Sequence, residues 1–393
     1  MRRLAFIAMA FAALAAAAWA PSPSPSPLLA PASLASLPAV PVPAHNPMSE
    51  EKIALGRLLF FDARLSGDAS TSCASCHLPQ HGWSHSEALA PGYPGHRLWR
   101  NNPTVLNAAY FRHLMWDGTL DSLEIQARSA MQAPVEGNGK AFMVEMRLRL
   151  IPDYVERFRR AFGSEWPQLD DAWRAIAAFE RTLVSDPRQV PFDRHLAGDR
   201  TALSPAARRG LALFEGKAGC VQCHYGALAS DEGFHALGVP RQQLFDSNPR
   251  VQIAVRWQNR QRDVPRAVYR NRDEDLGRYY RTRDPADIGK FRTPSLRELK
   301  YTAPYMHNGV FATLREVVDF FDAGGGETAN KSPLLKPLGL SSEEKTDLVA
   351  FLEALSMERP LLVAVPELPP ILPLDGVVGT DCAAPAPAAK ESL

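Results

Sequence analysis

Two short motifs pair cysteines with a histidine at the spacing that covalent haem attachment requires. They are Cys73-Ala-Ser-Cys76-His77 and Cys220-Val-Gln-Cys223-His224. Two thiols three positions apart can each form a thioether with one haem vinyl group, and the adjacent histidine then lies beneath the iron. A Cys-x-x-Cys pair alone fits a redox dithiol or half of a zinc site, but neither requires the following histidine. The sequence therefore predicts two c-type haems, with His77 and His224 as iron ligands.

The cysteine count and the charge balance limit the kinds of molecule that this protein is expected to bind. Of the five cysteines, four belong to the haem motifs, which leaves Cys382 in an Ala/Pro-rich tail as an exposed thiol without a chemical role. Lysine plus arginine total 44 against 43 aspartate plus glutamate, so nothing in the charge balance indicates nucleic acid. We expect a small redox partner or substrate instead.

The N-terminus has the pattern of a secretory signal. A basic start at Met1-Arg2-Arg3 precedes an apolar run from Leu4 to Ala18, and Ala18-Trp19-Ala20 offers small residues for cleavage. Residues 1–20 are therefore interpreted as a signal peptide. Because Pro21 follows the cleavage point directly, an uncleaved N-terminal membrane anchor remains the alternative. Covalent haem is attached outside the bacterial cytoplasm, which agrees with export to the periplasm.

The length and composition divide the chain into two domains between unstructured ends. A chain of 393 residues exceeds what one hydrophobic core usually serves. Residues 21–48 and 359–393 are rich in proline and alanine and are expected to be a linker and a tail, although a few apolar tail residues could lie against the surface. We expect an N-terminal haem domain at 49–190 and a C-terminal one at 191–358, divided where prolines and Gly198 interrupt the helical pattern.

Between the tails the periodicity is helical. Apolar residues of Asp171–Leu183 fall close to one helical face, and Ser204-Pro205 supplies an N-cap and first-turn proline for a helix running into the second motif. Capping boxes begin at Thr313 and Ser341. No sustained strand alternation competes with these patterns. The fold class is therefore predicted as mainly α, with two cytochrome c-like domains that each enclose one covalently attached haem.

Beyond the haem motifs, the chain resembles the bacterial dihaem cytochrome c peroxidase and MauG family from about Ile53 to Leu355. The similarity is carried by an ordered set of motifs. They are Leu58-Leu-Phe-Phe-Asp62, Arg100-Asn-Asn-Pro-Thr-Val-Leu-Asn107, Trp116-Asp-Gly118, Gln126, Glu136, Asp153-Tyr-Val-Glu-Arg-Phe158, the second haem motif and Thr302-Ala-Pro-Tyr-Met-His-Asn-Gly309.

The resemblance implies that the N-terminal haem is the peroxide site and that three residues serve it. Glu136 matches the distal carboxylate, which moves a proton between the peroxide oxygens, and Gln126 matches the glutamine that orients peroxide. Trp116 matches the tryptophan between the two haems, where an indole can relay electrons. Each of these residues taken alone could be an ordinary loop or core residue.

The resemblance also implies a calcium ion at the domain interface. Asn101, Thr302 and Pro304 match the family's oxygen donors, and side-chain and backbone oxygens suit this hard cation. Turn formation alone would also explain an asparagine and a proline.

The chain departs from the family pattern at the second iron. The distal ligand, methionine in the peroxidases and tyrosine in MauG, aligns with Phe321, which cannot ligate iron. Either Met306 or His307 substitutes, or the iron is open or water-ligated, and we favour the open iron because the motif positions of Met306 and His307 indicate structural roles. This departure puts in doubt the electron-entry role of the second haem.

Two further departures concern the first haem. Ala130 replaces a proline of the peroxide pocket, which leaves the pocket slightly roomier. The histidine that blocks the resting iron in many of the peroxidases has no aligned counterpart, although His81, His85 and His96 lie nearby in sequence. We expect an open, high-spin first haem.

Three functions follow from these features. The leading one is reduction of hydrogen peroxide with electrons from a small cytochrome c or cupredoxin. A MauG-like oxidase, which uses peroxide to oxidise a partner protein, is the close alternative. A plain electron-transfer dihaem cytochrome is the third, and it would not need Gln126 or Glu136. A homodimer is left open.

Overall fold

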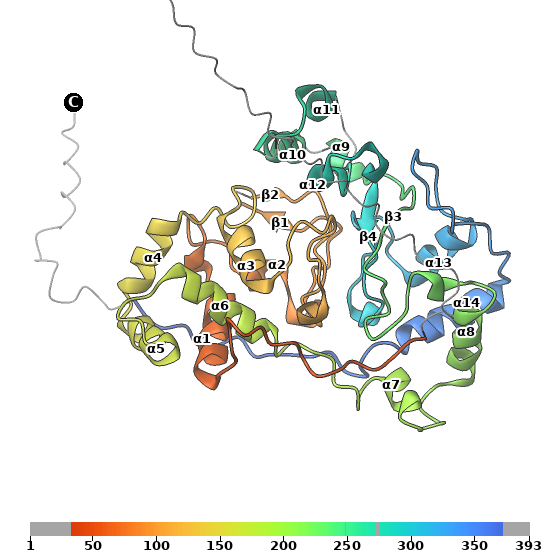
Figure 1. Ribbon diagram of the computed structural model, residues 1–393, viewed down its shortest axis with the longest axis horizontal. Coiled ribbons are helices and arrows are strands. Elements are labelled where there is room, and N and C mark those ends of the chain that lie inside the picture. The colour runs from red at the N-terminus through yellow and green to blue at the C-terminus, as the bar shows by residue number, and fades with distance from the viewer. Residues whose placement is uncertain (1–32, 94, 248, 262, 272–274, 372–393) are drawn as a thin grey trace, which may run out of the picture.

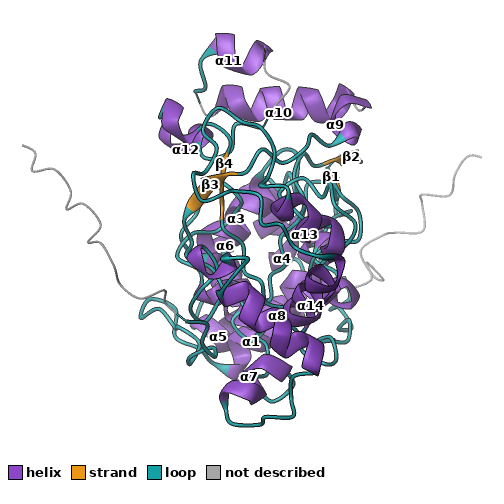
Figure 2. Ribbon diagram, turned by 90° about the vertical axis from the view of Figure 1, so that its right-hand side faces the viewer, coloured by secondary structure: helices purple, strands orange, loops and turns teal. Residues whose placement is uncertain are grey.

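The computed structural model describes residues 33–93, 95–247, 249–261, 263–271 and 275–371. The expected signal peptide and Cys382 lie outside these residues. The described chain is mainly helical, which confirms that part of the predicted fold class (Figures 1 and 2). Within it, no helix combines the length and apolar character needed to cross a membrane.

The secondary structure consists of short helices joined by long loops and two small antiparallel sheets. The helices are α1 (Glu50–Phe61), α2 (Cys73–Cys76), α3 (Leu123–Gln132), α4 (Ala141–Arg149), α5 (Pro152–Phe162), α6 (Leu169–Glu180), α7 (Pro191–Leu196), α8 (Pro205–Glu215), α9 (Gln243–Ser247), α10 (Pro249–Gln261), α11 (Arg266–Asn271), α12 (Tyr279–Thr282), α13 (Leu314–Asp322) and α14 (Ser342–Glu353). Strand β1 (Pro91–Gly92) pairs with β2 (His96–Arg97), and β3 (Phe234–Ala236) pairs with β4 (Lys290–Arg292). Helices α9 to α12 lie together at the top of both views (Figures 1 and 2).

The first half of the molecule packs around helices α1 and α6. Their backbones approach so closely that a Cβ on Gly56 would lie 1.8 Å from the carbonyl oxygen of Ala175. This contact requires glycine. The rings of Phe60, Trp83 and Phe179 fill the centre of the cluster. The same packing fixes α3, which lies against α6.

The second half packs around helices α8 and α14. Gly210 of α8 allows an equally close approach, because a Cβ there would lie 2.0 Å from the carbonyl oxygen of Asp347. Phe351 of α14 makes edge contacts with Phe192 and Phe214. The first large hydrophobic cluster includes residues up to Leu183, whereas Val190 belongs to the second.

The helix starts expected from capping chemistry are confirmed. Ser204 caps α8, and the capping boxes at Thr313 and Ser341 begin α13 and α14. The expectation that α8 continues into the second haem motif was wrong. The helix ends at Glu215, and Cys220–Gln222 form a separate 3₁₀ turn, because Gly219 takes a positive φ of 61° before it.

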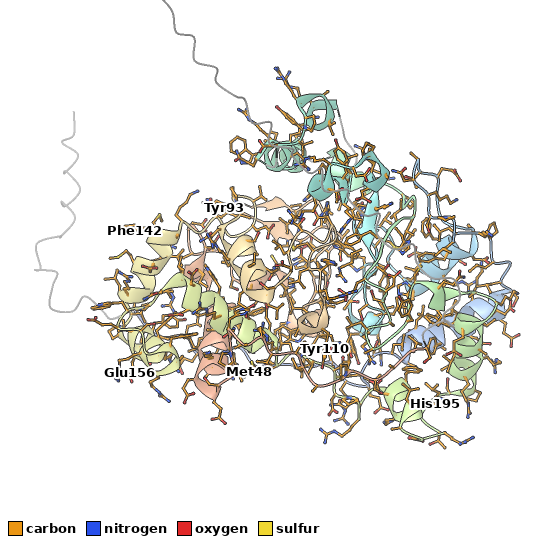
Figure 3. All side chains as sticks on the ribbon, in the orientation of Figure 1. Met48, Tyr93, Tyr110, Phe142, Glu156 and His195 are labelled. Carbon is orange, nitrogen blue, oxygen red and sulfur yellow. The ribbon has the colours of Figure 1, made fainter. Side chains whose placement is uncertain are left out.

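The two ends of the described chain cross between the halves (Figure 1). Leu34, in the N-terminal segment, packs in the second cluster and bridges Gly226, and Tyr110, labelled in Figure 3, donates a hydrogen bond to the carbonyl of Pro38. The C-terminal segment runs the other way, and Leu361 and Val363 pack against the first cluster.

The interpretation of residues 21–48 as an unpacked linker was therefore wrong for residues 33–48. Asn46 is fully buried there, and it donates to the carbonyl of Arg174 at 2.9 Å. Proline-rich composition reports poor helix and strand formation, but it does not exclude packing in an extended conformation.

A buried ion pair anchors the N-terminal segment to the second half. Arg297 makes two hydrogen bonds of 2.8 and 3.0 Å to Asp193, and it also donates to the carbonyl of Ala35. The side chains are 2% and 1% exposed. Each charge therefore depends on the other for compensation.

We expect Asp193→Asn to lower the free energy of unfolding by about 3–5 kcal/mol, because it leaves a buried guanidinium charge without its counter-ion. Urea unfolding of the haem-loaded protein measures this loss. The matched control is Arg188→Gln, which breaks an exposed pair with Asp186 and should leave the midpoint unchanged. Equal midpoints for the two variants would contradict the assignment.

Candidate active site

One cavity gathers the first haem motif and the residues predicted to act on peroxide. Its volume is about 140 Å³ for water-sized probes. The lining includes Cys73, Cys76, His77, Trp116, Gln126, Ala130 and Glu136. Residues separated by more than fifty positions in sequence thus meet at one site.

The environment of His77 suits an iron ligand. Its Nδ1 lies 3.1 Å from the carbonyl oxygen of Trp83, so Nδ1 donates the proton of this hydrogen bond and Nε2 is the ring nitrogen left to ligate an iron. Burial lowers the pKa of His77 to about 4, which keeps the ring neutral. Trp83 has a positive φ of 59°, a conformation uncommon outside glycine.

The second motif repeats this arrangement. His224 places Nδ1 2.8 Å from the carbonyl oxygen of Ala229, a residue that also has a positive φ, of 48°. Burial lowers the pKa of His224. In both motifs, a backbone carbonyl five or six residues after the histidine accepts a hydrogen bond from Nδ1. This bond fixes the same tautomer of the two histidine rings.

The four cysteines of the two motifs form no disulfide. Burial raises the pKa of Cys76 to about 11, with the charge of Glu136 acting in the same direction, and burial raises that of Cys220 to about 12. Two cysteines outside any disulfide, a neutral histidine and an open cavity are what a c-type haem requires at the first site. The residues present therefore fit this group.

Helix α3 and the turn after it supply the distal side chains. Gln126 and Ala130 are four residues apart and share the face of α3 that lines the cavity. Glu136 follows in a turn whose amides bond back to the end of the helix. Gly137 is required there, since a Cβ would lie 2.5 Å from the carbonyl oxygen of Met131.

Trp116 lies at the junction of the two halves. Its indole Nε1 donates to the carbonyl of Asn101 at 2.8 Å, and its own carbonyl accepts from the amide of Arg292 in β4. The ring also makes an edge contact with His307 at a centroid distance of 6.5 Å. The side chain is thus held by both halves.

The residues expected to bind calcium come from two segments that touch. The amide of Asn101 donates to the carbonyl of His307 at 2.8 Å, which brings Asn101 against the loop carrying Thr302 and Pro304. The side-chain amide of Asn101 donates to the carbonyl of Ala88. Calcium at this place stays a prediction.

Phe321 lies near the end of α13, half-buried, with its ring against Phe320. His307, one of the two candidates to replace it, is buried and stacks on Phe291 with ring centroids 3.7 Å apart. This stacking and the contact with Trp116 agree with a structural role for His307. The ligation state of the second iron stays a prediction.

Of the described residues that line the cavity, His77 is the one histidine. His85 is buried, and its Nδ1 accepts a hydrogen bond from the amide of Glu87. His81 is part of a 3₁₀ turn, and the side chain of His96 lies outside the described set.

Sequence reasoning missed several buried charged residues near the site. Arg100 forms ion pairs with Asp117 and with Asp275, which come from the two halves. Glu180, at the end of α6, lines the cavity. The available signal for Glu180 was a carboxylate at a buried position of an amphipathic helix, which normally requires a partner or a function.

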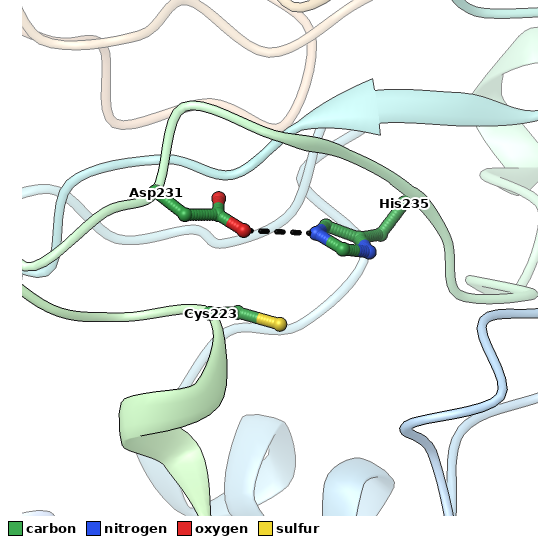
Figure 4. Close-up of side chains that lie close together, drawn as sticks. All are labelled: Cys223, Asp231 and His235. Carbon is green, nitrogen blue, oxygen red and sulfur yellow. Dashed lines mark hydrogen bonds and ion pairs between the residues drawn. The ribbon is translucent and has the colours of Figure 1, made fainter. Parts of the chain in front are cut away.

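A cluster of three possible metal-binding side chains lies beside the second haem motif. Asp231 and His235 form a hydrogen bond of 3.1 Å next to Cys223, and ligand atoms of the three residues lie within 4.8 Å of one another (Figure 4). Such a trio could hold a metal ion, but Cys223 is also the second thiol of a haem motif. The Asp231–His235 pair had no sequence signal, because its geometry depends on the fold of the loop after His224.

Comparisons with known proteins give a consistent assignment. The family model for di-haem cytochrome c peroxidase matches residues 50–201. Cytochrome-c peroxidase IdrP1 from a Pseudomonas species is 56% identical, over 86% of this chain and 89% of the relative. Methylamine utilization protein MauG of Methylorubrum extorquens is 41% identical, over 84% of this chain and 85% of the relative.

The fold has relatives among solved structures as well. The crystal structure of a MauG-like protein associated with microbial copper homeostasis superposes with a TM-score of 0.70 at 32% identity, covering 82% of this chain and 94% of that one. The family implies an oxidoreductase with two haem cofactors. With two haem motifs, a cavity lined by the first of them and relatives along most of its length, the chain belongs to the di-haem cytochrome c peroxidase family.

Proposed function

We propose that this protein is a periplasmic peroxidase that reduces hydrogen peroxide to water with electrons from a small cytochrome c or cupredoxin. Residues 49–190 would form the peroxidatic domain and 191–358 the electron-transfer domain, each with one covalently attached haem. The observation that carries the proposal is the convergence of His77, Gln126 and Glu136 on one cavity. A plain electron-transfer cytochrome has no use for the last two residues.

The side chains of the cavity divide the work. Cys73 and Cys76 would tether the haem and His77 would ligate its iron, and the haem when bound supplies the redox centre. Glu136 would take the proton from one peroxide oxygen and give it to the other as that oxygen leaves. The amide of Gln126 would orient peroxide without itself titrating. Trp116, held by both halves, would carry electrons between them.

Calcium would stabilise the junction. Asn101 can offer its side-chain oxygen, and Thr302 and Pro304 can offer carbonyl oxygens, all of which are suited to a hard cation. An ion there would bind both the segment next to Trp116 and the loop around His307.

The MauG-like alternative remains a second candidate because of two observations. The chain shares 41% identity with a MauG protein, and no described histidine other than His77 lines the cavity. Such an oxidase would use peroxide to oxidise a partner protein instead of drawing electrons from a carrier.

Steady-state turnover of peroxide with reduced cytochrome c tests the proposal. We expect rapid, peroxide-dependent oxidation of the cytochrome. A long-lived oxidised haem protein with negligible cytochrome oxidation would contradict the peroxidase and favour the alternative. Pyridine haemochrome analysis of the same preparation should give two c-type haems per chain.

A further inference from the structure

Glu180 is a buried carboxyl group on the wall of the cavity that the mechanism above does not use. Glu180 is the last residue of α6, and it is only 3% exposed to solvent. Its Oε2 finds no hydrogen-bond partner among the described residues. An unpartnered buried oxygen is costly if it is charged, so this position calls for an explanation.

The charged groups around Glu180 are already engaged with one another. Arg181, the next residue, pairs with Glu124 of α3 at 2.9 Å. Glu124 also accepts a hydrogen bond from Asn46 at 2.8 Å. The positive charge nearest in sequence is therefore balanced by Glu124.

The titration of Glu180 follows from these surroundings. Burial raises its pKa to about 8, the charge of Arg181 lowers it, and the charge of Glu124 on α3 raises it. From α2 the neighbour is Cys73, whose sulfur would carry no titratable proton in the haem-loaded protein because it forms a thioether. At neutral pH the side chain is thus a neutral acid with a proton to give.

Peroxide reduction needs such a proton. In the overall reaction, H₂O₂ + 2 H⁺ + 2 e⁻ → 2 H₂O, the O–O bond breaks, two donor molecules lose one electron each and both oxygens leave as water. The transfer assigned to Glu136 moves a proton within the peroxide and adds none. Two protons must therefore enter the cavity in each turnover.

We propose that Glu180 is the proton donor that delivers one of these protons to the cavity. It gives up its carboxyl proton during the reductive phase and is reprotonated from solvent before the next turnover. This inference rests on the proposed peroxidase function. It assigns the acid of the second half of the cycle, whereas Glu136 acts in the first.

Infrared spectroscopy tests the protonation state without turnover. At pH 7 the haem-loaded protein should show a carboxylic-acid carbonyl band that shifts in D₂O and is missing in Glu180→Gln. Glutamine imitates a neutral acid, so folding and haem content should be preserved. A band that is unchanged in the variant would overturn the inference, whether or not the protein reduces peroxide.

Turnover as a function of pH tests the role. Wild-type turnover should fall as pH rises through about 8, because the protonated fraction of Glu180 declines. Glu180→Gln should turn over about 10²-fold more slowly at pH 7, within the usual range for a general acid, and should lose that alkaline limb. Glu124→Gln removes a negative charge and should move the limb about one pH unit lower.

The control is Glu156→Gln, an exposed residue at the outer end of the first half (Figure 3), which should match wild type. If wild type oxidises cytochrome normally and Glu180→Gln keeps both rate and pH profile, this inference fails alone. If wild type itself does not oxidise cytochrome, the proposed function fails, and the infrared result still decides whether Glu180 is a neutral acid.

Discussion

Replacing Glu136 with glutamine should lower the rate of peroxide reduction about 10²- to 10⁴-fold, the range expected for loss of a general acid–base group. Glutamine keeps the size and hydrogen-bonding capacity of the side chain, and the turn that holds it is formed by backbone amides and Gly137. The loss should therefore report chemistry. Stopped-flow mixing of the ferric protein with peroxide measures it directly.

Gln126→Ala provides the comparison, because it removes an orienting amide but no titrating group, and it should cost less. Haem content and the ferric spectrum of both variants should equal those of wild type. Unchanged turnover in Glu136→Gln would place the base elsewhere in the cavity.

The second large effect is expected at Phe321. If this position faces the second iron, Phe321→Met should convert an open or water-ligated ferric centre into a low-spin His/Met centre. Its reduction potential should rise, because a thioether ligand favours ferrous iron. Near-infrared absorption and a spectroelectrochemical titration measure the two changes.

Phe320→Met is the matched control, since it adds the same side chain one position earlier on α13 and should leave ligation unchanged. Phe320 and Phe321 are in ring contact but project differently from the helix, as Phe320 also packs on Phe311. A wild-type spectrum that already shows His/Met or His/His ligation at the second haem would contradict the prediction and direct attention to Met306 and His307.

Local features of the sequence predicted local features of the structure well. Ser204, Thr313 and Ser341 mark helix starts because a capping hydrogen bond spans only three residues. The clustering of Gln126 and Glu136 with the first motif was predicted only through the family resemblance, since no spacing rule brings such distant segments together.

What the sequence could not supply depends on tertiary contacts. The packing of Asn46 and the burial of Glu180 are set by which segments meet, and both residue types are usually exposed. Composition also gave a wrong prediction for residues 33–48. Extended, proline-rich backbone can accept hydrogen bonds from other segments, and here Arg297 donates one to the carbonyl of Ala35.

Because the chain ends cross, a residue close to the C-terminus supports the first haem motif, which is synthesised much earlier. Trp83, whose carbonyl accepts the hydrogen bond of His77, donates its own buried indole N–H to the carbonyl of Leu361 at 2.8 Å. A chain emerging N-terminus first would therefore carry its first haem motif long before the last support of His77 is made. The hydrogen-bonded support behind His77 is therefore completed only when the C-terminal segment has been made.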